Sequence, residues 1–546
     1  MPPTTFPDDP AHPQPRSPTP DPPRSGFRIL DVIEKVGNKF PGPVLLFAML
    51  AVLVIVLSAI GNWSGWHVQP VSPVLDAAGR VSLVNKGDPI HVRSLANVDG
   101  VYWMLANMVR NFTSFPPLGL VITCMLGIGV AERVGLFATL MRFLAMITPR
   151  RLLTPMIVLL GCNSSIASDA GYLILPPLAA GLFYAVGRHP LAGAGAAFAG
   201  VAGGFGAGVF ITGADTVLAG FATAAGRVID PNVTVLATTN WYFKAASVVV
   251  LTLAGWAVTD LFIERRLRRS SPVDTAERPT DLVPLSSKEK SALGVSLLVL
   301  LAFVALYIAM VKIPGWPLYG EGSPTPADRP SARWSQVIVP MMFFTFLAPG
   351  LTFGFMTGAL RGQQSVCDAF YGAVKSLAPV IAMAFFAAQF LEYFKYSNLD
   401  RLMAFGGGKM LVHLDLPTPL LLVVFVVAII LADFAMSSMT AKFAVLAPIV
   451  IPMFMMVGVS PDLTTAGYRI GDSVVNIITP LNTYMPIVLL VLQKYRKGAG
   501  LGSLISLMVP YSLTFGVIWI AFLLLWYFTG LNLGPDAALN YTPPAH

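Results

Sequence analysis

The sequence predicts an all-α integral membrane protein with about nine spanning helices and two re-entrant helical hairpins in an inverted-topology repeat. The first observation is composition: of 546 residues, 55% are hydrophobic and only 12% are charged, against about 25% charged residues in soluble domains. The second is a series of apolar runs near the length of about 20 residues that a spanning helix needs. The third is a pair of similar polar stretches inside that apolar chain.

The two polar stretches cover residues 161–177 and 433–448, and each contains a Ser-Ser pair. A polar, non-helical segment at membrane depth is tolerated only where it is buried in protein or lines a cavity. Paired interruptions in two halves of a chain are typical of a transporter's binding site. We therefore expect a site between two hairpins, although hydropathy alone also allows each hairpin to be a full spanning pair.

Changes in composition divide the chain into six parts, with the charged linker as the boundary between the repeats. The parts are a disordered Pro-rich cytoplasmic tail (1–26), a first repeat with spans one to four and a hairpin at 153–187 (27–264), a cytoplasmic linker (265–288), span five with an outer loop (289–334), a second repeat with spans six to nine and a hairpin at 418–448 (335–530), and a C-terminal tail (531–546).

The apolar runs give each span in order, and spans one to four match spans six to nine in opposite orientation. Prolines at 116 and 117 should break span two, and span seven should break after Glu392. Basic residues flanking the spans place the N-terminus in the cytoplasm and the C-terminus in the periplasm. The expected spans are 41–61, 101–148, 191–213, 241–264, 290–312, 335–358, 370–395, 449–494 and 503–529.

The net charge of +8 is explained by these flanking basic residues rather than by nucleic-acid binding. The three cysteines and six histidines lack the spacing of a disulfide framework or a metal cluster. No phosphate-binding loop of the G-x-x-x-x-G-K-[ST] type is present, so an ion gradient is the expected energy source. We expect no cofactor other than sodium ions.

Ionisable residues inside spans are expensive and are functional candidates. Asp169, beside Asn163, Ser164 and Ser165, would form an oxygen-rich site for a cation. The alternative is a helix N-cap at the hairpin tip.

Arg469 and Asp472 lie three residues apart, so they share a face if their segment is helical. In the functional interpretation Asp472 binds a cation or proton, and the planar fork of Arg469 binds a substrate carboxylate. The alternative is a buried structural ion pair between the two.

The second polar stretch adds a basic and an aromatic candidate. Lys442 would receive an anion, and Phe443 would stack on an aromatic ring. Alternatively, Lys442 pairs with Asp433 or extends to the surface, and Phe443 is ordinary core. The further candidates for coupling a cation or proton are Asp433, Ser437, Ser438 and Asn476.

Long ordered strings in the chain, NSSIASDAGY, AQFLEYFKYSNL and AKFAVLAPIVIPMFMMVGVSPDLTTAGYRIGDSVVNIITP among them, resemble the AbgT family of p-aminobenzoyl-glutamate transporters. The resemblance implies an elevator-type homodimer of the bacterial inner membrane. It also implies import of p-aminobenzoyl-glutamate, or export of p-aminobenzoate and sulfonamides, coupled to sodium or protons. The positions it marks as important are Asp169, Thr440, Phe443, Pro461, Arg469, Asp472 and Pro480.

The chain departs from the family's usual residues at four single positions and in one short run, where Met436–Thr440 stands in place of the usual Gly-Ser-Ala-Ser. Phe443 replaces Trp, Asp433 replaces Asn, Gly208 replaces Asn and Val475 replaces Thr. The loss of Asn and Thr oxygens, and the new carboxylate at Asp433, bear on the coupling ion and on the substrate.

The leading hypothesis is an ion-coupled secondary transporter of small aromatic carboxylates, with Arg469, Lys442, Phe443, Thr440, Pro461 and Pro480 at the substrate. An importer of other dicarboxylates with altered ion coupling is the first alternative. An intramembrane hydrolase using Asp169 and Asp472 as an acid–base dyad, and a channel, are remote ones. The chain contains neither HExxH nor GxSxG, so we do not expect an enzyme.

Overall fold

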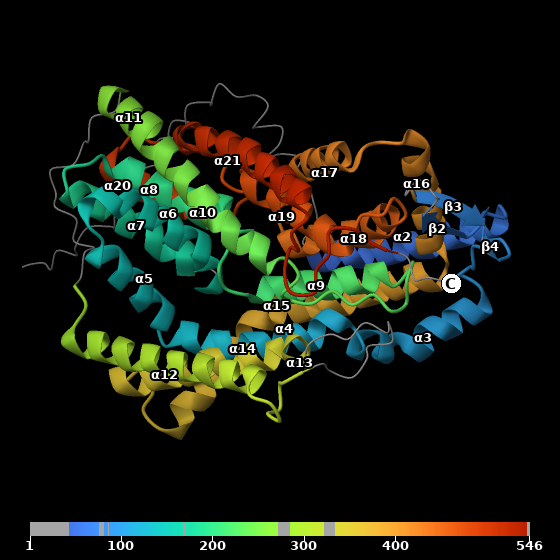
Figure 1. Ribbon diagram of the computed structural model, residues 1–546, viewed down its shortest axis with the longest axis horizontal. Helices are drawn as coiled ribbons and strands as arrows, with labels where there is room; N and C mark the ends of the chain where they lie inside the picture. The colour runs from blue at the N-terminus through green and yellow to red at the C-terminus, as the bar shows by residue number, and fades with distance from the viewer. Residues whose placement is uncertain are drawn as a thin grey trace, which may run out of the picture.

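The computed structural model describes residues 43–75, 81–85, 87–167, 170–270, 284–320 and 333–542, and these residues are overwhelmingly helical (Figure 1). The Pro-rich segment 1–26, Asp169 and most of the 265–288 linker lie outside the described residues. The helices are α2 (Pro43–Trp63), α3 (Val98–Thr113), α4 (Pro116–Arg133), α5 (Leu136–Ile147), α6 (Leu153–Asn163), α7 (Ala170–Ala185), α8 (Pro190–Phe198), α9 (Gly213–Gly226), α10 (Trp241–Ala257), α11 (Glu264–Ser270), α12 (Ser287–Lys312), α13 (Arg333–Gln336), α14 (Ile338–Thr357), α15 (Gln363–Tyr396), α16 (Leu399–Leu414), α17 (Thr418–Asp433), α18 (Met439–Met455), α19 (Pro461–Val475), α20 (Met485–Tyr495) and α21 (Leu501–Thr529).

Short 3-10 and π segments and four short strands complete the described part. The 3-10 turns are η1 (Arg150–Leu152) and η2 (Ser164–Ala167), and the π-helices are η3 (Ala199–Gly203) and η4 (Val258–Ile263). Strand β1 (His67–Val68) pairs antiparallel with β4 (Ile90–His91), and β2 (Val71–Leu75) with β3 (Val81–Asn85). The expectation of an all-α chain therefore missed two small ribbons between α2 and α3, where turns rather than apolar runs set the structure.

Seven of the described helical stretches are long and apolar enough to cross a bilayer: Pro43–Trp63, Val98–Arg133, Trp241–Arg269, Ser287–Lys312, Ile338–Thr357, Gln363–Tyr396 and Leu501–Thr529. The expected third span is helical only to Gly203. The expected eighth span divides among the end of α18, α19 and α20. These shorter helices do not meet the length of a full span. The count of nine spans therefore stays a prediction.

The proline pair at 116–117 sets one helix boundary as expected. Helix α3 ends at Thr113 and α4 begins at Pro116, because proline lacks an amide hydrogen and is tolerated in the first turn of a helix. The expected break after Glu392 is wrong. Helix α15 continues through that residue to Tyr396, and Glu392 lies 3.7 Å from Lys395 in a partly exposed ion pair. A carboxylate with such access to water gives no reason for a helix to end.

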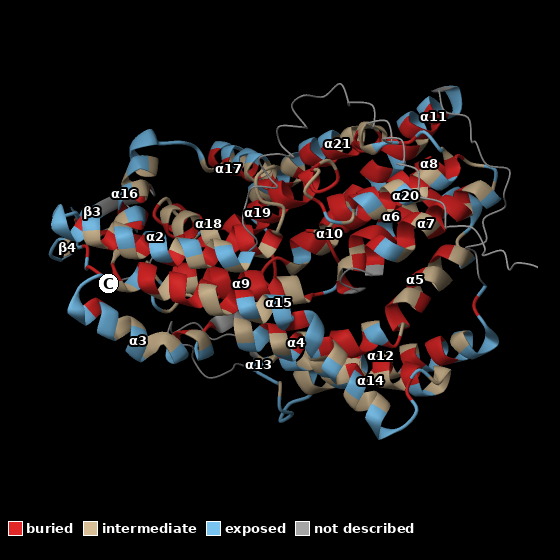
Figure 2. Ribbon diagram, turned by 180° about the vertical axis from the view of Figure 1, so that it is seen from behind, coloured by how far each residue is buried: buried red, intermediate tan, exposed pale blue. Residues whose placement is uncertain are grey.

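Helix α14 packs against α4 and α12 along one side of the molecule, and α15 packs against α2 and α4 (Figure 1). The buried residues concentrate in the other part, around α6, α8, α10, α19 and α21 (Figure 2). Helix α17 packs along α19, whereas α18 packs along α9 and α16. The two helices of the expected second hairpin are joined by residues 434–438, and both contact α19, although α18 packs mainly on α9 and α16.

Close backbone approach explains one glycine pair near the centre. A Cβ on Gly161 of α6 would stand 2.7 Å from the Cα of Gly200 in η3. Both residues must therefore stay small for the first polar stretch to pack against the π-helix.

Candidate functional site

Helix α19 forms the centre of the candidate site, and it is a polar helix in a buried place. It begins at Ser460, whose hydroxyl accepts a hydrogen bond from the Leu463 amide at 3.0 Å, with Pro461 at the first position. Every residue from Leu463 to Val475 is buried. Buried charges persist only when they are paired, so Arg469 and Asp472 must find partners on neighbouring helices.

Arg469 and Asp472 turn to different partners rather than to each other. Within the described residues, Arg469 pairs with Asp215 and Asp472 pairs with Lys442. The alternative of an Arg469–Asp472 ion pair is therefore not what the structure shows. Helix α19 instead contributes one charge to each of two buried clusters, which we call the basic triad and the acidic triad.

The basic triad consists of Asp215, Lys244 and Arg469. The carboxylate of Asp215 lies 2.6 Å from the Lys244 Nζ and 2.6 Å from an Arg469 Nη. All three side chains are 5% exposed or less. Asp215 also caps α9, because its Oδ2 accepts a hydrogen bond from the Thr212 amide at 2.7 Å. Two cations around one carboxylate leave this triad with one excess positive charge.

Asn240 links the basic triad to the start of α19. Its Oδ1 accepts a hydrogen bond from Arg469 Nε at 3.1 Å, and its Nδ2 donates to the Asp462 carbonyl at 2.9 Å. The Asp462 carboxylate accepts the Thr239 hydroxyl and stands in the first turn of α19, where the helix dipole favours a negative charge.

The acidic triad consists of Asp433, Lys442 and Asp472. The Lys442 Nζ contacts Asp433 and lies 2.9 Å from Asp472 Oδ1, and these side chains are 2% exposed or less. Asp433 ends α17 and Lys442 lies in the first turn of α18. A negative charge at the end of a helix and a positive charge at the start of one are both unfavourable with respect to the helix dipole. The contact between Asp433 and Lys442 offsets this cost. This triad has one excess negative charge.

Each carboxylate of the acidic triad has one oxygen with no hydrogen-bond donor among the described residues. Asp433 Oδ2 and Asp472 Oδ2 are both buried and unpartnered in this way. The Tyr468 hydroxyl donates to the Met439 carbonyl at 2.6 Å and lies 3.4 Å from Asp472 Oδ1. Two orphaned carboxylate oxygens in a dry interior form a ready acceptor for a proton or a small cation.

The aromatic candidate lies beside this triad. Phe443 is 1% exposed, and its ring centroid is 4.6 Å from that of Tyr468. The Lys442 ammonium lies 5.8 Å from the Tyr468 ring centroid, within the range of a cation–π contact. Lys442 is thus paired with Asp433, as one alternative held, and Phe443 is packed in the interior.

The first polar stretch reaches the site through an irregular segment at residues 204–212. Asn163 Oδ1 accepts the Val209 amide at 2.9 Å, and the Ser473 hydroxyl accepts the Gly206 amide at 2.8 Å. The Ser164 hydroxyl is used locally, because it donates to the Gly161 carbonyl at 2.7 Å. Segment 204–212 therefore links Asn163 to α19. Ser165, two residues after Asn163, is half-buried.

The remaining predicted residues lie around the ends of α18 and α19. Ser438 caps α18, and Ser437 donates to the Leu481 carbonyl at 3.3 Å. The carbonyl of Asn476 accepts from the Asn482 side chain at 2.7 Å. Thr440 and Pro480 are half-buried and Pro461 is buried. Asp169 falls outside the described residues, so its place relative to these groups stays a prediction.

Sequence reasoning did not place Asp215, Lys244 or Asn240 at the site. Lys244 carried a usable signal, because it is a single cation inside the apolar run of α10 and such residues are functional candidates. Its partner on α9 could not be read from the sequence, since only the packing of α9, α10 and α19 brings the three charges together.

The fold and the site together define a class. Helices long and apolar enough to span a membrane surround a buried centre in which two charged clusters meet on one short helix. Ionisable side chains in such a place mark substrate and ion pathways through a membrane. The family model of the AbgT putative transporter family matches residues 28–541. The chain belongs to this transporter family.

Individual relatives agree with this membership. The chain is 35% identical over 506 residues to the p-aminobenzoyl-glutamate transport protein of Escherichia coli K12, covering 92% of this chain and 95% of that protein. The fold is similar to the YdaH transporter of Alcanivorax borkumensis, with a TM-score of 0.82, 35% identity, and 91% of this chain and 100% of the other covered. It is also similar to MtrF of Neisseria gonorrhoeae, described as one of a class of antimetabolite efflux pumps, with a TM-score of 0.84, 37% identity, and 93% and 100% covered.

Proposed function

We propose that this protein is an ion-coupled secondary transporter of small aromatic carboxylates of the p-aminobenzoyl-glutamate and p-aminobenzoate type. One observation carries the proposal. Helix α19 contributes Arg469 to a buried triad with excess positive charge and Asp472 to a buried triad with excess negative charge. The first suits an organic anion and the second suits a coupling cation.

The basic triad supplies the anion chemistry. Arginine binds carboxylates through two parallel hydrogen bonds, and Arg469 holds Asp215 in the present conformation. A substrate carboxylate would replace Asp215 at the guanidinium while Lys244 retains Asp215. The substrate ring would meet the aromatic pair of Phe443 and Tyr468.

The acidic triad supplies the coupling chemistry. A proton or sodium ion would neutralise the excess negative charge at the orphaned oxygens of Asp433 and Asp472. Neutralising a buried carboxylate removes the cost of burying it, and this would let α17, α18 and α19 move relative to one another. Asp169, Asn163 and the serines of both polar stretches would complete the ion path.

The finer architecture follows from the same proposal. The pairs α6–α7 and α17–α18 act as re-entrant hairpins, and the part that carries them moves as an elevator against a dimerising scaffold. The protein lies in the bacterial inner membrane as a homodimer with its N-terminus in the cytoplasm, an orientation supported by the arginine-rich ends of the spans.

The names of the relatives do not give one direction of transport. The Escherichia coli relative is named for p-aminobenzoyl-glutamate transport and the Neisseria relative for antimetabolite efflux. Export of sulfonamides and uptake of p-aminobenzoyl-glutamate both fit an anion site coupled to a cation site. The extra carboxylate of Asp433 favours a variant in which other dicarboxylates move with altered ion coupling, because it adds a titratable group beside Lys442.

The test is flux of radiolabelled p-aminobenzoate in vesicles containing the purified protein. A sodium gradient and a proton gradient are imposed in turn, with Asp472→Ala as the control variant. Gradient-driven flux that disappears in the variant supports the proposal and identifies the ion. Equal flux with and without each gradient, in both proteins, would contradict it.

A further inference from the structure

Two histidines face each other on the small ribbon between α2 and α3, at one end of the molecule (Figure 1). His67 of β1 and His91 of β4 are direct partners in the antiparallel register. At the adjacent position the Val92 amide donates a hydrogen bond to the Trp66 carbonyl at 3.0 Å. The pair at 67 and 91 is therefore a non-hydrogen-bonded pair of the ladder, the kind in which opposite side chains come closest.

The other face of the ribbon fixes its backbone to α16. Val68 is buried in a small apolar cluster with Phe405 of α16. The Asn398 side chain donates a hydrogen bond to the His91 carbonyl at 2.9 Å. Because successive side chains of a strand point to opposite faces, His67 and His91 lie on the exposed face. The backbone is thus held in place, while both imidazole rings are accessible to an ion from solution.

The hydrogen bond of the His67 ring defines which of its nitrogens is available. Its Nδ1 lies 3.0 Å from the Gly65 carbonyl oxygen. A carbonyl oxygen only accepts, so Nδ1 carries the hydrogen, and the lone pair of the neutral ring is on Nε2. Metal-binding histidines almost always donate their other ring N–H to a carbonyl, a carboxylate or water, which fixes the tautomer and the ring orientation. His67 therefore has the tautomer that binds a metal ion through Nε2.

The distance between the two rings fits one shared metal ion. The ring centroids of His67 and His91 are 5.3 Å apart, and the ring planes differ by 37°. Two imidazoles on one tetrahedral zinc ion, each with a zinc–nitrogen distance of about 2.0–2.1 Å, have ring centres about 5 Å apart. Among the residues that the structure describes, no group of three or more His, Cys, Asp or Glu side chains could hold a metal ion. Water would therefore complete the coordination.

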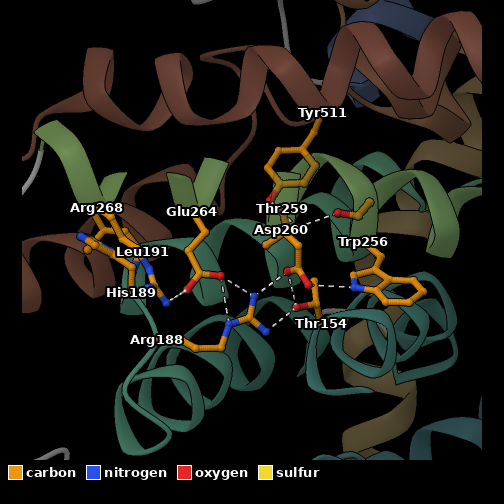
Figure 3. Close-up of polar contacts among 11 residues, drawn as sticks. Thr154, Arg188, His189, Leu191, Trp256, Thr259, Asp260, Glu264, Arg268 and Tyr511 are labelled. Carbon is orange, nitrogen blue, oxygen red and sulfur yellow. Dashed lines mark hydrogen bonds and ion pairs between the residues drawn. The ribbon is translucent and has the colours of Figure 1, made fainter. Parts of the chain in front are cut away.

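The environment of His189 shows why that histidine is a poorer candidate. Its Nδ1 accepts a hydrogen bond from the Leu191 amide at 3.3 Å and so caps α8. Figure 3 shows His189 among residues of an ion-pair network, in which Glu264 lies 2.6 Å from Arg188 and 2.8 Å from Arg268. A ring nitrogen that already caps a helix, close to two guanidinium groups, is unsuited to binding a cation.

We infer that His67 and His91 together bind a divalent transition-metal ion, with zinc as the representative ion. Imidazole nitrogen suits zinc, copper and nickel, whereas magnesium and calcium prefer oxygen ligands. A shared ion would join β1 to β4 and so link the end of α2 to the residues that precede α3. The inference is independent of the transport substrate and of the coupling ion.

The test is calorimetric titration of the full-length protein with zinc chloride, in detergent and without a polyhistidine tag. The wild-type protein should bind zinc and should not bind magnesium at the same concentration. His67→Gln and His91→Gln should each weaken zinc binding at least about tenfold, because losing only the group behind a metal-bound histidine already costs about 10–100-fold. The matched control is His413→Gln, which removes an exposed histidine near the end of α16 and should leave zinc binding unchanged.

Hydrogen exchange then locates the bound ion. Zinc should slow amide exchange within residues 67–91 of the wild-type protein but not of His67→Gln. All three variants replace exposed side chains, so they should stay folded. The inference is overturned if the wild type does not bind zinc, if either ribbon variant binds it as tightly as the wild type, or if His413→Gln loses binding equally. Slower exchange only outside residues 67–91 would also overturn it.

Discussion

The two triads on α19 differ in which ion is shared, and this difference separates their roles. In the acidic triad one cation, Lys442, serves two carboxylates, whereas in the basic triad one carboxylate, Asp215, serves two cations. Both are nearly fully buried. Removing the shared ion of a buried triad leaves two like charges unpaired, so it should strongly lower the free energy of unfolding. Removing one of the two outer ions leaves a neutral pair, so the loss should be smaller. The comparison predicts an order of effects.

The largest effect should follow Lys442→Met. The substitution leaves Asp433 and Asp472 buried together without a cation, and each already has an orphaned oxygen. Breaking a buried pair in this way costs about 3–5 kcal/mol of unfolding free energy. Thermal unfolding of the detergent-solubilised protein measures it. Lys395→Met is the control, because its side chain is 63% exposed and its pair with Glu392 spans 3.7 Å. That control should cost less than about 1 kcal/mol.

Lys244→Met should cost less, about 1–2 kcal/mol, because Arg469 still pairs with Asp215 after the lysine is gone. The same unfolding measurement in the same detergent tests the difference. If Lys244→Met lowers the free energy of unfolding as much as Lys442→Met does, the number of ions that a side chain pairs with does not determine its contribution to stability.

Much of this site was predictable from the sequence, and the reason for the rest is physical. Arg469, Asp472, Asp433 and Lys442 stand out because charges in apolar segments are rare. Of the observed pairs, only Lys442 with Asp433 was among the alternatives. The partners of Asp472 and Arg469 depend on how distant helices pack, and the sequence does not show this. Lys244 comes from a helix more than two hundred residues earlier.

In the fold, too, features set by neighbouring residues were predictable and features set by distant residues were not. Helix starts such as Pro116 were predictable because proline acts locally. The ribbons at residues 67–91 were not, because their pairing carries no apolar periodicity.

Asp433→Asn should change the ion dependence more than the stability. It removes the excess negative charge but leaves Lys442 paired with Asp472 at 2.9 Å, so the unfolding free energy should change by about 1 kcal/mol or less. Flux as a function of pH in reconstituted vesicles is the measurement. A pH profile identical to that of the wild type would exclude Asp433 from coupling.

The last prediction concerns Asp400, a buried carboxylate in α16 outside the candidate spans, which forms no ion pair with the residues that the structure describes. Burial raises its pKa to about 7. The folded state therefore holds a proton that the unfolded state releases near pH 4, so stability falls as pH rises from about 4 to 7. Asp400→Asn should flatten this part of the stability curve. Unfolding temperatures measured from pH 5 to 8 that keep the wild-type slope would contradict the assignment.

We propose that α19 binds substrate through Arg469 and the coupling ion through Asp472. The most direct test of this proposal is the kinetics of p-aminobenzoate flux in vesicles for Arg469→Gln and Asp472→Asn. Arg469→Gln should raise the substrate KM at least tenfold with unchanged ion dependence. Asp472→Asn should abolish gradient-driven accumulation but keep substrate exchange. If both variants change the same parameter in the same way, the two triads do not have separate roles.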